Sequence, residues 1–151
     1  MAEHIYTGSL EIALPRDEVF PFFANAENLQ RITPPNLGFQ IITRTPIEMK
    51  AGALIDYRIS LHGIPMTWRT EITSWDPPFE FVDTQLKGPY KQWIHRHTFT
   101  ETPNGTTLIE DEVRYRLPFE PFGDLARFFV EREIKGIFDY RQKIVADVFK
   151  K

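Results

Sequence analysis

A long amphipathic helix near the C-terminus constrains the fold of this chain more than any other stretch. Apolar residues recur at helical spacing over residues 124–149, and Asp124 can cap the first turn through its side-chain oxygen. At about 1.5 Å per residue, such a helix can cross a whole small domain. The apolar stripe consists of Val130, Ile134, Ile137, Phe138, Val145 and Val148.

Arg141 lies inside this stripe. At about 100° per residue, its side chain projects between Ile134 and Val148 rather than toward solvent. A guanidinium in that position needs an acceptor, because burial of an unpaired charge is costly. The acceptor can be Asp111 or Asp83, in an ion pair that locks the helix to a sheet, or the polar head of a bound ligand. We favour the ion pair as the more common use of a buried charge, and the two can coexist.

The length and composition exclude several classes of protein. A chain of 151 residues predicts a single domain, residues 1–151, with a sizeable core. The net charge of −3 argues against a nucleic-acid partner, which would need a clustered basic face. No stretch predicts stable membrane insertion and no signal peptide is evident, so a soluble cytoplasmic protein is expected. The absence of cysteine excludes disulfides and thiolate metal sites.

Upstream of the long helix, alternating apolar and polar residues predict strands over residues 5–14, 39–44, 53–61, 66–75, 79–86, 90–101 and 106–117. After the first strand, Asp17 can cap a helix that Pro21 keeps short, and residues 25–31 can form another turn or two. Strands flanked by helices predict an α+β fold with an antiparallel sheet. The apolar face of this sheet needs a cover, which we expect the long helix to supply.

The last two strands form a hairpin whose register follows from its faces. The inward apolar residues match only if the loop has an odd number of residues. A three-residue loop over residues 103–105, with Gly105 in the left-handed conformation, meets this condition. A two-residue Asn-Gly turn is the stronger local signal, but it would place Phe99 opposite Glu110. The three-residue loop pairs Phe99 with Ile109, His97 with Asp111, His95 with Val113, and Trp93 with Tyr115.

This register predicts an inward-facing polar cluster of His95, His97 and Asp111 below Arg141, which Asp83 can join. Two histidines and a carboxylate can bind a metal ion, but a bare His-x-His pair is a weak signal. We therefore expect histidines satisfied by hydrogen bonds, with no metal and no cofactor. Alternatively, Asp111 can orient His97 as a general base. No Ser or Cys nucleophile accompanies the pair, which argues against a covalent mechanism.

Aromatic side chains dominate the predicted interior. The thirteen Phe suit an apolar cavity between sheet and helix as well as a solid core, which is the simpler interpretation for any one residue. The charged side chains of Glu131, Arg132, Glu133 and Lys135 are expected on the solvent-exposed face of the helix. The expected lining residues are Tyr57, Ile59, Trp68, Ile72, Phe81, Asp83, Trp93, His95, His97, Phe99, Asp111, Val113, Tyr115, Ile134, Ile137, Phe138 and Arg141.

Several short motifs resemble those of a known superfamily. They are Pro15-x-x-Glu18-Val19-Phe20, Ala26-Glu27-Asn28-Leu29, residues 93–99, Asp111-x-Val113-x-Tyr115, and Ile137-Phe138-x-Tyr140-Arg141. With them, nearly the whole chain resembles the START/Bet v 1-like (SRPBCC) superfamily, in a bacterial branch of polyketide cyclase/dehydrase and lipid-transport-like proteins. That branch also occurs fused to nucleotide-sugar epimerase-like domains.

The resemblance implies a helix-grip fold. In this fold a curved antiparallel sheet of about seven strands wraps around a long C-terminal helix, with short helices after the first strand. The resemblance also implies a small hydrophobic or amphipathic ligand between sheet and helix. It implies no particular reaction, because the superfamily has no shared catalytic motif.

Three functions remain open from the sequence. The first is a binding or carrier protein for a small hydrophobic molecule with a polar head. The second is an enzyme of cyclase or dehydratase type, in which His95 or His97 moves protons under the influence of Asp111. The third is a protein-interaction or stress module, which would have a well-filled interior and an exposed apolar patch. We rank them in this order, and the ligand and the oligomeric state stay open.

Overall fold

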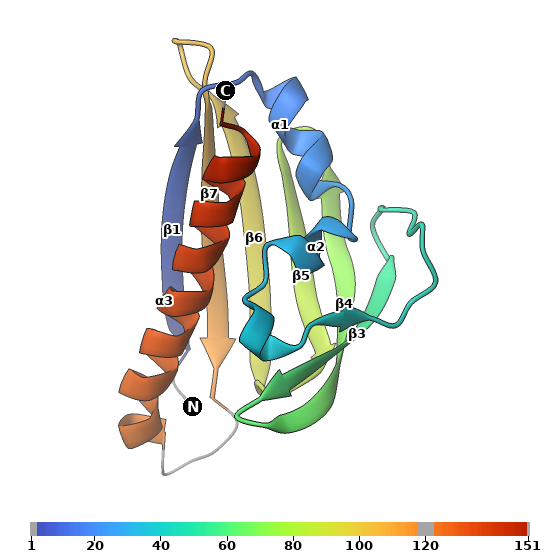
Figure 1. Cartoon of the computed structure of the whole chain (residues 1–151), viewed down its shortest axis with the longest axis vertical. Coiled ribbons are helices and arrows are strands. Elements are labelled where there is room, and N and C mark those ends of the chain that lie inside the picture. Colours follow the sequence, from blue (N-terminus) through green and yellow to red (C-terminus); the bar gives the residue numbers. More distant parts are fainter. Residues whose placement is uncertain (1–2, 118–122, 151) are drawn as a thin grey trace.

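A computed structural model describes the backbone of residues 3–117 and 123–150, and the side chains of these residues except 123–125. The strands form one curved antiparallel sheet in the order β1-β7-β6-β5-β4-β3-β2 (Figure 1). The α+β helix-grip fold expected from the sequence is thus confirmed. The strands are β1 (His4–Ile12), β2 (Gln40–Ile41), β3 (Leu54–Leu61), β4 (Ile64–Asp76), β5 (Glu80–Lys87), β6 (Gln92–Glu101) and β7 (Thr107–Arg116).

The helices share the cover of the sheet. The long helix α3 (Gly123–Val148) lies along β1 and β7, as Figure 1 shows. The helices α1 (Arg16–Phe23) and α2 (Asn28–Arg31) and the 3-10 helix η1 (Pro35–Leu37) cover the rest, with α1 against β6 and η1 against β3. The prediction that the long helix alone covers the sheet is therefore wrong, because α3 packs on one side of it.

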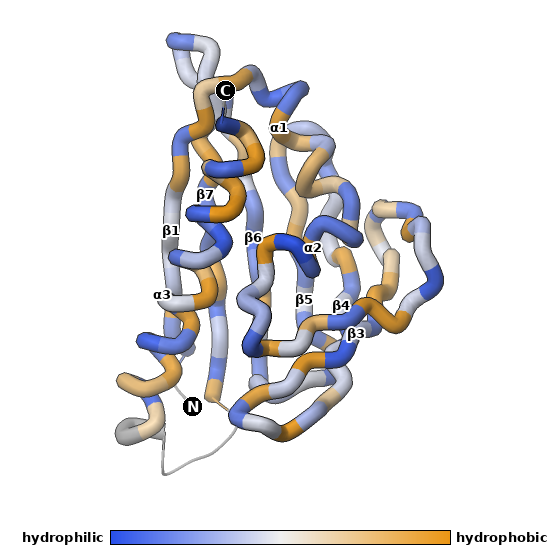
Figure 2. The backbone as a smooth tube through the Cα atoms, in the orientation of Figure 1, coloured by the Kyte–Doolittle hydropathy of each residue, from blue (hydrophilic) through white to orange (hydrophobic). Residues whose placement is uncertain are grey.

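Two apolar clusters hold the helices on the sheet. Beneath α1, Phe20 packs against Phe99 of β6, with ring centroids 5.0 Å apart. Beneath α3, Ile134 and Phe138 pack with Val113 of β7. Along α3, hydrophobic and hydrophilic stretches alternate in Figure 2, as expected for a helix with one buried face.

The register of β6 and β7 is the predicted one. Gly105 adopts a φ of 76°, and the amide of Thr102 donates to the carbonyl of Thr106 across the turn, at 2.9 Å. A slip of one residue would turn the histidines of β6 outward. The observed pairs are Phe99 with Ile109, His97 with Asp111, His95 with Val113, and Trp93 with Tyr115.

Two local predictions are wrong. The strand expected over residues 39–44 is reduced to Gln40–Ile41, because the amides of Ile42 and Thr43 both donate to the carbonyl of Asp56 and end the ladder. The helix α1 begins at Arg16 without a side-chain cap, so Asp17 lies in its first turn instead, where its charge complements the helix dipole. The predicted cap of α3, Asp124, lies outside the described side chains.

Candidate functional site

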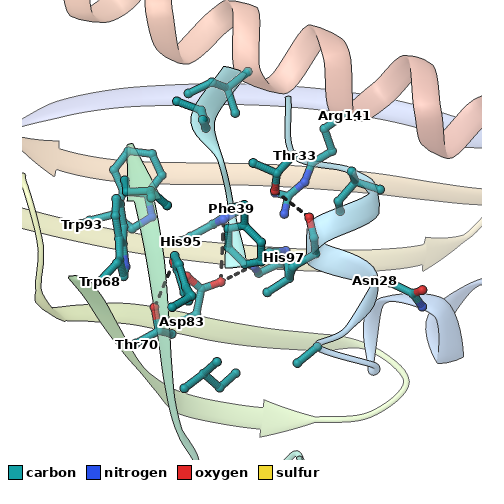
Figure 3. A pocket seen from close by; sticks show the side chains of 18 of the residues that line it. Asn28, Thr33, Phe39, Trp68, Thr70, Asp83, Trp93, His95, His97 and Arg141 are labelled. Atoms are coloured by element: carbon teal, nitrogen blue, oxygen red, sulfur yellow. Dashed lines mark hydrogen bonds and ion pairs between the residues drawn. The ribbon is translucent and has the colours of Figure 1, made fainter. Parts of the chain in front are cut away.

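A cavity of about 150 Å³ lies between the sheet and its helical cover. Strands β3, β4, β5 and β6 form its floor, and α3 and the segment 22–39 form its roof. Its wall is mainly apolar and aromatic, and Figure 3 shows Asp83, His95 and His97 close together among its polar side chains. Such a combination is typical of sites for small molecules.

Most of the lining residues expected from the sequence lie on this wall. Period-two alternation places the sheet residues there, and the helical stripe places the residues of α3 there. Contact between these residues and a ligand stays a prediction. The expected residues on the wall are Tyr57, Ile59, Trp68, Ile72, Phe81, Asp83, Trp93, His95, His97, Ile137, Phe138 and Arg141.

Five expected lining residues do not lie on the wall. Val113, Tyr115 and Ile134 fill the interface where α3 packs directly on the sheet. Phe99 belongs to the cluster beneath α1. Asp111 lies behind the two histidines of β6 and is 8% exposed. The expectation was wrong for these residues because α3 packs against β7, so the cavity lies toward β3, β4 and β5.

Sequence reasoning missed the roof contributed by residues 22–39, which includes Asn28, Thr33 and Phe39. No periodic pattern marks this segment, because its position depends on packing against distant strands. By contrast, Ile55 and Leu61 also line the cavity, and the alternation along β3 could have identified them.

Glu133 was missed for a different reason. Its charged neighbours suggested a solvent-exposed face of the helix, yet Glu133 lines the cavity. Its carboxylate pairs with His62 at the tip of the β3–β4 hairpin, at 3.0 Å. This contact links the hairpin to α3 beside the cavity.

Two imidazole–carboxylate pairs form the polar region. His95 and His97 are both buried and stack with ring centroids 3.6 Å apart. His95 Nε2 lies 2.7 Å from Asp111 Oδ1, and His97 Nε2 lies 2.5 Å from Asp83 Oδ2. The other nitrogen of each ring faces the other carboxylate, with His95 Nδ1 3.7 Å from Asp83 and His97 Nδ1 3.6 Å from Asp111. The four side chains therefore form one compact cluster.

The hydrogen bonds of this cluster differ from the predicted pairing. His97 is opposite Asp111 in the backbone register, but the bonded carboxylate is Asp83 of β5. Asp83 is opposite His95 in its own register, so both bonds run diagonally between strands. Diagonal neighbours on one face are within reach of long side chains. The predicted general-base pair of His97 with Asp111 is therefore wrong in its partner.

The pKa values of the cluster follow from burial and from charge. Burial raises the pKa of Asp111, but the hydrogen bond to His95 and the charges of His95, His97 and Arg141 outweigh it and lower this pKa to about 2. The same groups lower the pKa of Asp83 against its burial. Burial and the charge of His95 lower the pKa of His97 to about 4, and the two carboxylates offset this only in part. At neutral pH both carboxylates are ionised and His97 is neutral.

Asp83, His95 and His97 also form a set of possible metal ligands. One donor atom from each lies within 4.8 Å of the other two. The sequence had suggested Asp111 as the carboxylate of such a set. The structure instead brings Asp83 to the cavity side of the histidines and leaves Asp111 behind them.

Arg141 reaches from α3 into the cavity (Figure 3). Its guanidinium carbon lies 5.4 Å from the centroid of the Phe138 ring. It forms no hydrogen bond or ion pair with any residue that the structure describes. The predicted ion pair with Asp111 or Asp83 is therefore wrong, because histidines hold both carboxylates.

A second donor on the cavity wall also lacks an acceptor. The Nε1 atom of Trp68 is buried and makes no hydrogen bond. By contrast, the neighbouring Tyr57 hydroxyl lies 3.4 Å from Thr70 Oγ1, and burial raises the pKa of Tyr57. The Arg141 guanidinium and the buried Trp68 N–H thus lack acceptors among the described residues.

A comparison with known protein families identifies the family of this chain. The family model for polyketide cyclase / dehydrase and lipid transport matches residues 12–138. The chain belongs to this family. The matched region includes the described wall of the cavity except Arg141, and it confirms the START/Bet v 1-like resemblance. No curated protein sequence matches the chain. None of the described helices is long and apolar enough to cross a membrane.

Solved structures are similar to this family member in fold. The Zhui aromatase/cyclase from Streptomyces sp. R1128 has a TM-score of 0.79 at 15% identity, over 99% of this chain and 94% of that chain. A START superfamily protein from Mycobacterium smegmatis has a TM-score of 0.70 at 10% identity, over 96% of this chain and 99% of that chain. At such identities the likeness shows the fold alone.

A third structure is a nucleoside-diphosphate sugar epimerase from Corynebacterium glutamicum. It has a TM-score of 0.68 at 28% identity and covers 94% of this chain, but the match spans only 28% of that chain. The similarity therefore concerns one part of a larger protein.

Proposed function

We propose that the chain, residues 1–151, is a binding or carrier domain for a small apolar molecule whose anionic head pairs with Arg141. The observation that carries this proposal is the Arg141 guanidinium, which lies on an apolar wall without an acceptor among the described side chains. A partly buried cation without a partner costs free energy, and a ligand carboxylate would remove that cost through two parallel hydrogen bonds. Membership of the family supports a small hydrophobic ligand. A cytoplasmic location stays a prediction.

The size and lining of the cavity support a compact ligand body. A protein cavity of about 150 Å³ is known to hold one benzene ring, and the volume here is about 150 Å³. Trp68 and Trp93 meet edge to face on the wall, with ring centroids 5.5 Å apart, and offer flat apolar surface. A second oxygen on the ligand could accept from the unpaired Trp68 N–H. We therefore propose one-ring aromatic acids as the ligand class.

Calorimetric titration with one-ring aromatic acids and the matching neutral amides tests this proposal. We expect the acids to bind more tightly than the amides and Arg141→Gln to abolish the difference. Hydrogen bonds to charged groups contribute about 1.5–3 kcal/mol, so the loss should be about 10- to 150-fold in affinity. Arg132→Gln, at an exposed position on the same helix, is the matched control. Equal affinity of the acids for Arg141→Gln and the unmodified protein would overturn the proposal.

A second candidate function is an enzyme of cyclase or dehydratase type. The observation that favours it is the pair of imidazole–carboxylate contacts on the cavity wall. His97 is neutral at neutral pH, and its Nε2 donates to Asp83, which holds the ring in place. Its Nδ1 then carries the lone pair that can accept a proton. One fold neighbour is an aromatase/cyclase, which makes this reaction class a reasonable alternative.

The fate of a bound molecule separates the two candidates. A carrier releases its ligand unchanged, whereas an enzyme converts it, and His97→Gln would then keep binding but lose turnover. The third possibility from the sequence, a protein-interaction module, predicts a well-filled interior. The cavity between the sheet and the helices argues against this protein-interaction role.

A further inference from the structure

The cluster of Asp83, His95, His97 and Asp111 places three possible metal ligands close together. We propose that Asp83, His95 and His97 bind one divalent transition-metal ion on the floor of the cavity, with Asp111 positioning the histidines from behind. This inference does not depend on the ligand proposed above. It rests on the donor set, the outer carboxylate and the charge of the cavity.

The donors converge from two neighbouring strands. Asp83 of β5 is opposite His95 of β6, and His97 is the next residue on the same face. Asp83 Oδ2 lies 2.5 Å from His97 Nε2 and 3.7 Å from His95 Nδ1. Two donors about 2.1 Å from a tetrahedral metal ion are about 3.4 Å apart. The Asp83–His97 contact must therefore open by about 0.9 Å and the Asp83–His95 contact close by about 0.3 Å. The two histidine nitrogens, which lie within 4.8 Å of each other, must reach a similar separation.

Asp111 occupies the position of an outer carboxylate. It faces the Nε2 atom of His95 at 2.7 Å, and because an ionised carboxylate only accepts, this nitrogen carries the hydrogen. In a neutral His95 ring, the form that binds a metal ion, the lone pair then lies on Nδ1, the atom that faces Asp83. Metal-binding histidines commonly have such a carboxylate on their second nitrogen.

His97 needs one change of tautomer. In its present hydrogen bond, Nε2 of His97 donates to the ionised Asp83. Binding of a metal ion through Nε2 would move this proton to Nδ1, which lies 3.6 Å from Asp111 Oδ1. The proton stays on the same ring, and Asp111 Oδ1 would have to approach His97 Nδ1 by about 0.6 Å to accept a hydrogen bond from it.

The charge of the cavity favours a cation at this place. Three carboxylates lie on or directly behind its described wall, namely Asp83, Asp111 and Glu133, whereas Arg141 is the one permanent cation among the described lining residues. Glu133 contacts His62, whereas the carboxylates of Asp83 and Asp111 contact only the two imidazoles of the cluster among the described side chains. A divalent ion would compensate both carboxylates at short range.

The donor set also indicates the class of metal. Imidazole and carboxylate without thiolate suit zinc, iron, cobalt or nickel. All three donors line the cavity, so the remaining coordination positions would face the space where we place the ligand. A metal ion there would make the histidines ligands rather than bases, which would exclude the proton-transfer role of His97 in the second candidate function.

Titration of the chelator-treated full chain with Co²⁺ and Zn²⁺ tests the site directly. We expect one Co²⁺ per chain, with a visible absorption band that Zn²⁺ displaces. Asp83→Asn and His97→Gln should each weaken the affinity by at least about 100-fold. Asp111→Asn should weaken it by about 10- to 100-fold, as expected for an outer carboxylate. The matched control is His62→Gln, which removes a histidine outside the cluster and should bind as the unmodified protein does.

The outcome for the unmodified protein is decisive even if a variant fails to fold. Imidazole ¹⁵N resonances of His95 and His97 should shift on addition of Zn²⁺, whereas those of His62 should not. Absence of a one-to-one Co²⁺ complex, or equal binding by folded Asp83→Asn, would overturn the proposal. Arg141→Gln should leave metal affinity within a few-fold, so failure of the metal site and failure of the ligand proposal give different results.

Discussion

At the scale of single residues, the polar groups of the cavity differ in whether the protein satisfies them. Histidines hold both buried aspartates, whereas Arg141 and the Trp68 N–H have no acceptor among the described residues. Helical periodicity predicted the direction of Arg141, because about 100° per residue fixes the angle of a side chain. It could not predict the partner of Arg141. Whether Asp83 pairs with His97 or with Arg141 depends on distances between elements, which periodicity does not give.

Acid should destabilise the protein through His97. The pKa of His97 is about 4 in the folded protein, whereas an exposed histidine titrates near 6.5. Between these values the folded protein binds fewer protons than the unfolded chain, so the free energy of unfolding falls as the pH falls from about 6.5 to about 4, by about 3 kcal/mol. Urea unfolding at a series of pH values, with a chelator present, measures this loss.

Two variants separate His97 from the other titrating groups. His97→Gln should remove most of the slope between about pH 6.5 and 4. His62→Gln, which replaces a side chain that is 54% exposed, should retain it. An unchanged slope in His97→Gln would contradict the assignment. Below the ordinary pKa of 3.8, the lowered pKa of Asp111 should cause a further loss of stability.

At the scale of elements, the sequence predicts the strands and helices in which apolar and polar residues alternate with a regular period. Alternation locates the strands of the sheet, and matching of apolar faces fixes the register of β6 and β7. The short helices after β1 carry too few residues for a clear period, so their role as a roof could not be predicted. The end of β2 depends on one carbonyl, that of Asp56, which accepts two amides.

Two glycines test the account of the local elements. Gly105 has a φ of 76° in the β6–β7 turn, so Gly105→Ala should reduce the free energy of unfolding by about 1–2 kcal/mol. Gly136 lies inside α3, where an added Cβ meets no atom within 4 Å among the described residues. Gly136→Ala should therefore raise the free energy of unfolding by about 0.5–1 kcal/mol. Urea unfolding of both variants checks these signs, and a shift in the same direction for both would contradict the account.

At the scale of the whole molecule, the direct packing of α3 on β1 and β7 decides where space remains. The cavity lies over β3 to β6, under the short helices and one face of α3. The expected site residues Val113 and Tyr115 of β7 therefore lie in the hydrophobic core. Sequence patterns show which face of a strand points inward, but not how closely a helix packs on it. The fold does not name a ligand, so the function must be argued from the cavity.

The cavity volume predicts selectivity for ligand size. One-ring acids fit a volume of about 150 Å³, whereas fused four-ring acids would require the roof to move. A ligand at about 100 times its Kd contributes about 2.7 kcal/mol, which corresponds to a rise in Tm of about 5–10 °C. Thermal unfolding with both classes of acid measures this difference. A larger rise with the four-ring acids would contradict the proposed ligand size.

Native mass spectrometry of the protein and of Arg141→Gln, purified side by side, tests the central claim most directly. We expect the unmodified protein to carry a small molecule that organic extraction releases and that contains an acidic group. Arg141→Gln should carry much less of it, while Arg132→Gln should carry the same amount. A molecule retained equally by all three proteins, or a neutral hydrocarbon in the cavity, would contradict the role of Arg141 as the partner of an anionic head.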